Sequence, residues 1–61
     1  MFFIVETLYY KQKFIVRADG VMEAKRKTAH ALAKMKINTT ATELEVTEIS
    51  AFLSDKDVAQ I

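Results

Sequence analysis

Few side chains in this sequence could perform catalysis or bind a metal. His30 is the only histidine, and the chain has no cysteine. A zinc site needs three or four His, Cys or carboxylate ligands, and no carboxylate lies four residues before or after His30. Ser50 and Ser54 have no paired base, and a single glycine, Gly20, cannot form a glycine-rich phosphate loop. We therefore expect that the protein is not an enzyme and has no catalytic, cofactor or metal site.

Three glutamates in the second half of the chain, Glu43, Glu45 and Glu48, could form a carboxylate cluster. Strand alternation, however, places only Glu43 and Glu45 on one face. Charged side chains are common on edge strands, where they discourage pairing with another chain. We interpret the glutamates as solvated charges at the edge of a sheet.

Basic side chains are a third group that could have a chemical role. Residues 1–38 carry eight basic and three acidic side chains, whereas residues 39–61 carry one basic and five acidic ones. A domain with one positive and one negative sector can dock in a defined orientation or pair with a second copy, although such charges also serve solubility. The residues that we select for a charged contact are Arg17, Lys25, Arg26, Lys27 and Lys34.

The same basic residues define an alternative function, which is binding to nucleic acid through a basic helix face. Phe2, Tyr9 and Tyr10 could add stacking contacts with bases. The net charge is only +1 and the isoelectric point is about 8.0, below the strongly basic footprint of such proteins. Nucleic acid is therefore the second choice of partner, after another protein.

Length and composition restrict the elements that can position these residues. The 61 residues allow one domain, 1–61, and its 51% apolar and 28% charged residues are not a disordered composition. No apolar run approaches the roughly 20 residues that cross a bilayer. The first residues, MFFIV, lack the preceding basic region and the cleavage site of a signal peptide. We therefore expect a cytoplasmic domain without membrane contact.

Two runs rich in β-branched and aromatic residues, 2–10 and 14–18, are typical of β-strands. The polar residues between them predict an antiparallel hairpin. Its loop consists either of Lys11 and Gln12 alone or of the four residues 10–13.

Charge favours one register for this hairpin. Either loop places Glu6 opposite Arg17 and Leu8 opposite Ile15. Opposite charges across a strand pair contribute about 0.2–1 kcal/mol, and a shift by one residue would lose this pair. The other face of the hairpin then carries Phe3, Val5, Thr7, Tyr9, Phe14, Val16 and Ala18.

Residues 21–36 are rich in Ala, Lys and Met, which predicts a helix. Either Asp19 or Gly20 caps its start, with Glu23 at the third helical position when Gly20 is the cap, and Asn38 is expected to follow its end. The opposite, polar side of the helix carries Glu23, Arg26, Lys27, His30 and Lys34. Helical spacing predicts a core stripe of Val21, Ala24, Thr28, Ala31, Leu32 and Met35.

Residues 43–50 alternate and predict a third strand, with Leu44 and Val46 on one face. Ile49 departs from that alternation, which predicts a bulge or an early end. Residues 54–57 match a capping box, Ser-x-x-Asp, so a short helical turn is expected near the C-terminus. The fold class is therefore α+β, a three-stranded antiparallel sheet of β-β-α-β topology and order 2-1-3, with one helix on one face.

One helix covers only one face of such a sheet, and large apolar side chains lie on the other. Burial of each is worth about 1.5–3 kcal/mol, so we expect a cover over this face. The cover is a second copy of the chain, which would make a homodimer, or another protein, or a C-terminal turn with Phe52, Leu53, Val58 and Ile61. The predicted protein interface is Phe2, Ile4, Leu8, Tyr10 and Ile15.

Element order and short motifs together resemble a known family. The hairpin FIVETLYYKQKFIVRA, the helix start DGVMEAKRKTAHA and the strand ELEVTEI are similar to small bacteriophage-encoded β-β-α-β proteins that bind host enzymes, among them the coliphage early inhibitor of bacterial RNA polymerase. The resemblance covers residues 3–50. It implies a viral inhibitor or modulator that occludes the surface of a host enzyme in the host cytoplasm. That family carries arginines in its last strand where this chain has Glu48 and Ser50, so what carries over is a host-directed binder.

Overall fold

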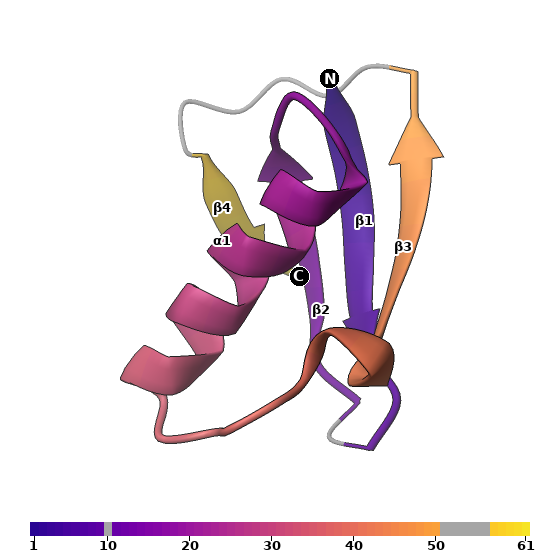
Figure 1. Cartoon of the computed structure of the whole chain (residues 1–61). Helices are drawn as coiled ribbons and strands as arrows, with labels where there is room; N and C mark the ends of the chain where they lie inside the picture. Colours follow the sequence, from indigo (N-terminus) through magenta and orange to yellow (C-terminus); the bar gives the residue numbers. More distant parts are fainter. Residues whose placement is uncertain (10, 51–56) are drawn as a thin grey trace.

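The computed structural model describes residues 1–9, 11–50 and 57–61, which form one α+β layer structure. Figure 1 shows the helix lying across one face of the sheet. Within the described residues, no helix has the length and apolarity needed to cross a membrane. In chain order the elements are β1 (Phe2–Thr7), β2 (Lys13–Arg17), α1 (Val21–Lys34), the 3-10 turn η1 (Ala41–Glu43), β3 (Leu44–Ile49) and β4 (Val58–Gln60).

The sheet has four antiparallel strands in the order β3-β1-β2-β4, whereas the sequence predicts three. The first three strands have the predicted arrangement, with β1 between β2 and β3. The prediction of a C-terminal helical turn is wrong for the described C-terminal residues, because Val58–Gln60 form a strand beside β2. Residues 54–56 of that turn, and Phe52 and Leu53 as a cover, lie outside the described residues. A strand of three residues is too short to show a period in the sequence.

The register of β1 with β2 differs from the predicted one by four residues. Glu6 lies opposite Lys13 and not opposite Arg17, and Leu8 lies outside both strands. Because the shift is an even number of residues, every side chain within the strands keeps its predicted face. Glu6 still faces an opposite charge, since its carboxylate is 3.9 Å from the Nζ of Lys13.

Local hydrogen bonds explain why the hairpin closes early. The N–H of Thr7 donates to the carbonyl of Gln12 at 2.9 Å, and the Oγ1 of Thr7 accepts the N–H of Gln12 at 2.9 Å. Lys11 adopts a left-handed conformation, with φ 53°. A threonine side chain that bonds the backbone competes with the strand ladder, so β1 ends at Thr7 although strand-type residues continue beyond it.

The start of α1 uses Gly20 as N-cap, one of the two predicted choices, in an extended conformation without a side-chain cap. Glu23, the acidic residue of the first turn, provides a side-chain hydrogen bond at this end of the helix. The Oε1 of Glu23 accepts the N–H of Asp19 at 3.3 Å. This arrangement satisfies a backbone donor that precedes the helix and places a negative charge near the positive end of the helix dipole.

The end of α1 is a Schellman motif, so the helix stops at Lys34 and not at residue 36. The N–H of Lys36 donates to the carbonyl of Ala33, and the N–H of Ile37 donates to that of Leu32, both at 3.0 Å. Lys36 supplies the left-handed residue that this motif requires, with φ 61°. The predicted stop at Asn38 is therefore two residues too late.

The core lies between α1 and the facing side of β1, β2 and β3. The hydroxyl of Thr28 is satisfied there, because it donates to the carbonyl of Ala24 at 2.8 Å. Val21 and Met35, predicted for the core, are 47% and 42% exposed, since they lie at the two ends of the helix. Tyr9 is also exposed, because β1 ends before it. The buried residues are Phe3, Val5, Thr7, Phe14, Val16, Ala18, Ala24, Thr28, Leu32 and Leu44.

β3 is a regular edge strand of the described sheet. Its register with β1 is continuous from the pair Thr7–Leu44 to the pair Phe2–Ile49, so the predicted bulge is absent from this pairing. Ile49 follows the alternation and lies on the face opposite α1, together with Phe2. Glu45 is exposed on this edge, in agreement with the interpretation of the glutamates as edge charges.

Candidate functional site

The face of the sheet opposite α1, here called the open face, consists of three rows of side chains that cross the strands. Residues that pair across neighbouring strands share a face, so the registers define these rows. Backbone hydrogen bonds extend the β2–β4 register by one residue at each end, to Asp57 and Ile61. In the order β3-β1-β2-β4, the first row is Ile49, Phe2, Arg17 and Asp57, the middle row is Thr47, Ile4, Ile15 and Ala59, and the third row is Glu45, Glu6, Lys13 and Ile61.

The centre of the open face is apolar and only half-buried. The other side of the same strands is fully used for the core, where Phe3 and Val16 are at most 1% exposed. Contiguous exposed apolar surface on a small domain is typical of an interaction site. We call this group the apolar block; it comprises Phe2, Ile4, Ile15, Ile49 and Ala59.

Charged side chains border the apolar block at both ends of the strands. Glu6 and Lys13 form an ion pair in the third row, with side chains 52% and 49% exposed. Arg17 and Asp57 form a second pair in the first row, at 2.6 Å. Solvent screens an exposed ion pair and leaves it little effect on stability, so these charges have more influence on the orientation of a partner than on the fold.

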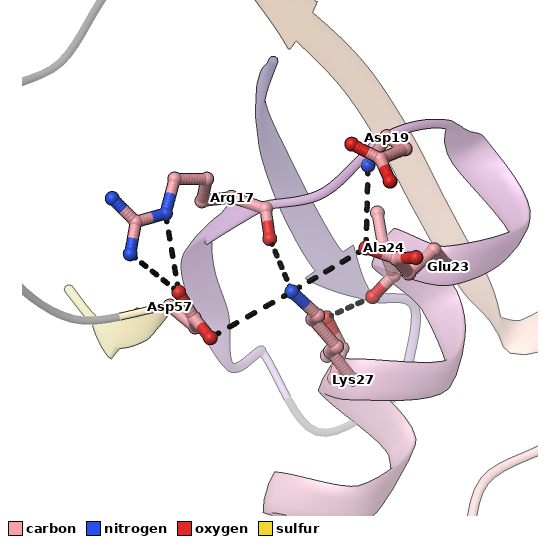
Figure 2. A network of polar contacts seen from close by, with 7 residues as sticks. Arg17, Asp19, Glu23, Ala24, Lys27 and Asp57 are labelled. Carbon is pink, nitrogen blue, oxygen red and sulfur yellow. Dashed lines mark hydrogen bonds and ion pairs between the residues drawn. The ribbon is translucent and has the colours of Figure 1, made fainter.

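Asp57 belongs to a polar network that joins β4 to β2 and α1, with the Nζ of Lys27 at its centre (Figure 2). The Nε and Nη2 of Arg17 donate to the Oδ1 of Asp57 at 3.1 and 2.6 Å. Lys27 lies between the elements. Its Nζ donates to the carbonyl of Arg17 at 2.7 Å and lies 3.8 Å from Asp57 and 3.4 Å from Glu23. The network fixes the beginning of the short β4 strand against the first half of the helix.

Both carboxylates of this network titrate below their ordinary range. The hydrogen bond from Arg17 is the main cause that lowers the pKa of Asp57, followed by the charge of Lys27. The pKa of Glu23 is lowered mainly by the N–H of Asp19, with a further contribution from Lys27. The network is therefore fully formed above the ordinary carboxyl pKa, and it is lost as the pH falls through the lowered values.

A second surface lies on the helix side of the sheet, between α1 and β4. It is an open groove of about 420 Å³, here called the basic groove. Arg26, His30 and Lys34 follow one another at four-residue spacing along α1, which is a rise of about 6 Å per step. Ala31 and Val58 supply its apolar part. The positive charges of Arg26 and Lys34 attract an anionic group. The complete lining is Arg26, Lys27, His30, Ala31, Lys34, Asp57 and Val58.

The structure brings together three of the five predicted interface residues. Phe2, Ile4 and Ile15 belong to the apolar block. Leu8 is 52% exposed in the turn after β1 and does not face Ile15, so its placement on this face is wrong. Tyr10 lies outside the described residues.

The predicted charged residues of α1 line two adjoining surfaces. Arg26, Lys27 and Lys34 line the basic groove together with His30, and Lys27 also contacts Arg17 in the polar network. Lys25 lines a smaller cavity of about 170 Å³, which it shares with Arg26. Arg26 therefore connects the two surfaces.

Sequence reasoning missed Ile49, Ala59 and Ile61 as members of the open face. Alternation alone could have placed Ile49 on the open face, because positions 45, 47 and 49 of a strand point to the same side. The sequence prediction assigns apolar residues to only the other face of that strand. Ala59 and Ile61 are two apolar residues at alternate positions. A pattern of only two residues does not distinguish a strand from a turn.

In the part of the chain that the structure describes, no three His, Asp or Glu side chains form a group able to hold a metal ion. Comparison with protein-family models, with curated proteins and with solved structures found no match for the chain. What the protein binds therefore has to be inferred from its own surfaces.

Proposed function

We propose that this chain is a small non-catalytic binding protein, and that its open face is the contact surface for another protein chain. The observation that carries the proposal is the apolar block, five half-buried side chains on one flat face while the opposite face forms the core. Complete burial of such a side chain is worth about 1.5–3 kcal/mol relative to full exposure, and because these side chains are already partly buried, a partner gains the remaining fraction of that value from each.

The composition of the open face favours a protein over a nucleic acid. A protein interface has an apolar centre and a polar rim, which is the arrangement of the apolar block and its two charged borders. Glu6 and Glu45 lie on this face and would repel phosphates. The resemblance to phage-encoded host-binding proteins is in agreement with a function as an inhibitor or modulator, in which the chain occludes the surface of a host enzyme in the host cytoplasm.

A pair of matched variants tests this function. Ile4→Asp places a charge in the centre of the apolar block, whereas Met22→Asp places one on the exposed side of α1, where Met22 is 75% exposed. The immobilised proteins are incubated with a bacterial lysate, and bound proteins are quantified by mass spectrometry. We expect a protein that binds wild type and Met22→Asp to be lost from Ile4→Asp. Equal capture by an Ile4→Asp variant with an unchanged circular dichroism spectrum would refute the proposal.

The basic groove supports a second candidate function, binding to a single-stranded nucleic acid. The observation in its favour is the row of Arg26, His30 and Lys34 beside an apolar floor. We expect Arg26→Glu with Lys34→Glu to abolish binding of a labelled oligonucleotide in fluorescence anisotropy, and Lys25→Glu, outside the groove, to have a smaller effect. Wild-type affinity should also fall steeply with salt. Binding that survives the double substitution excludes the groove as the site.

A further inference from the structure

We infer that the open face binds a second copy of this chain, packed face to face about a two-fold axis that runs parallel to the strands and passes between β1 and β2. The inference rests on the proposed function, because it names the partner of the same face. It follows from the order of side chains within the three rows.

The two-fold axis determines which side chains meet. A rotation about an axis parallel to the strands reverses the strand order and leaves each row in its place. β1 then lies over β2 of the second copy, and β3 lies over β4. Face-to-face sheets pack with their strands within about 30° of each other, so the rows stay matched close to the axis.

The middle row matches apolar with apolar side chains across this axis. Ile4 lies over Ile15 of the second copy, and by symmetry Ile15 lies over Ile4. Further from the axis, Thr47 lies over Ala59. The four isoleucines form a continuous apolar centre, which is the arrangement expected for the core of a protein interface.

The inner pair of the third row matches opposite charges, whereas the outer positions of the first and third rows, Ile49 over Asp57 and Glu45 over Ile61, lie far from the axis and do not match. Glu6 on β1 lies over Lys13 of the second copy, and Lys13 lies over Glu6. Each copy already holds this pair at 3.9 Å, so the dimer would contain a square of four alternating charges. In the first row the ring of Phe2 lies over the guanidinium of Arg17 of the second copy, a pairing that a cation–π contact favours.

The other two-fold axis in the plane of the face does not give this match. An axis perpendicular to the strands places each strand over itself and exchanges the first row with the third. Lys13 would then lie over Arg17 of the second copy, and Glu6 over Phe2. Like charges across an interface are unfavourable, so the charges favour the parallel axis.

The dimensions of the open face set the expected affinity. Four strands about 4.8 Å apart, with five residues of about 3.4 Å each, give a footprint on the order of 300 Å². A standard interface buries roughly 800 Å² per partner, so this contact is well below the standard size and supports only a weak dimer. We expect reversible association in the micromolar range or weaker.

Charge reversal tests the axis. Sedimentation equilibrium is measured from about 10 to about 500 μM for wild type, Glu6→Lys, Lys13→Glu and the double variant. We expect wild type to dimerise with rising concentration, and each single reversal to weaken the dimer roughly tenfold or more because symmetry places like charges together twice. The double reversal restores opposite charges and should recover the dimer. Both residues are about half-exposed, so the fold should tolerate the changes, which circular dichroism verifies.

The outcomes separate this inference from the proposed function. A wild-type protein that stays monomeric up to the highest concentration overturns the dimer, and a double variant no better than the single ones overturns the axis. If Lys13→Glu strengthens association, the perpendicular axis is correct, because the new carboxylate would lie over Arg17. A monomer that still captures another protein through Ile4 refutes only the dimer, whereas capture that does not depend on Ile4 refutes the open face as the contact surface.

Discussion

Replacement of Lys36 by glycine should leave the protein more stable than replacement by alanine, because Lys36 is held in a left-handed conformation that a side chain disfavours. Its φ of 61° is required by the Schellman motif, in which Lys36 and Ile37 donate to the carbonyls of Ala33 and Leu32. The Cβ atom costs about 1–2 kcal/mol in this conformation, and glycine avoids that cost. Glycine also makes the unfolded chain more flexible, which opposes the gain by about 0.4–1 kcal/mol. The expected net gain from the backbone is about 0.5–1 kcal/mol, and relative to wild type the loss of the lysine charge offsets most of it.

Lys36→Ala is the matched control for this substitution. It keeps the Cβ atom and removes the positive charge near the helix C-terminus, which by itself is worth about 0.3–1 kcal/mol. The difference between the glycine and alanine variants therefore isolates the backbone effect, and we expect the glycine variant to be more stable by about 0.5–1 kcal/mol. For a domain of this size, 1 kcal/mol corresponds to about 4–8 °C in Tm.

Thermal and urea denaturation, followed by circular dichroism at low protein concentration, provide the measurement. Low concentration matters because self-association would raise the apparent stability of every variant. A glycine variant that unfolds at the same temperature as the alanine variant, or below it, would show that the left-handed conformation of Lys36 carries no cost, and the Schellman end of α1 would have to be reconsidered.

Three further predictions concern the hairpin, the core and the polar network. Lys11→Gly should stabilise the fold for the same reason, since its φ is 53°, and its effect should add to that of Lys36→Gly in the double variant, measured by urea denaturation. Leu32→Ala should cost about 2–5 kcal/mol because Leu32 is fully buried. That loss is comparable with the roughly 3–9 kcal/mol total of a domain this small, so its urea midpoint should fall sharply, and an unchanged midpoint would contradict the core assignment. The lowered pKa values of Glu23 and Asp57 predict stability that is present above their ordinary values of 4.5 and 3.8 and lost as the pH falls through the lowered ones. Asp57→Asn should therefore make the urea midpoint fall less steeply as the pH is lowered. An unchanged slope would show that other carboxylates cause the loss of stability in acid.

The buried faces were predictable because they depend on local periodicity. Alternation alone places Phe3, Val5, Phe14 and Val16 on one side of the hairpin, and all four are buried. The same holds for α1, whose buried residues fall at helical spacing within the predicted range. Periodicity is independent of the register, so an error of four residues in the pairing did not change which side faces the core.

The register and the fourth strand were not predictable from composition. The register depends on the hydrogen bonds between Thr7 and Gln12 and on the conformation of Lys11, which no residue pattern in the hairpin indicates. β4 depends on contacts between residues distant in sequence. Arg17 and Asp57, which fix its beginning, are 40 positions apart. A three-residue strand is defined by such partners and not by its own sequence.

The fourth strand is also what links the two candidate surfaces. On the helix side, Val58 and Asp57 complete the lining of the basic groove beside α1. On the open face, the same strand adds Ala59 to the middle row. Because the two surfaces lie on opposite sides of one sheet, a dimer formed through the open face leaves the groove of each copy accessible. The proposed self-association and the proposed anion binding are therefore compatible in this fold, and the groove depends on the network that fixes β4.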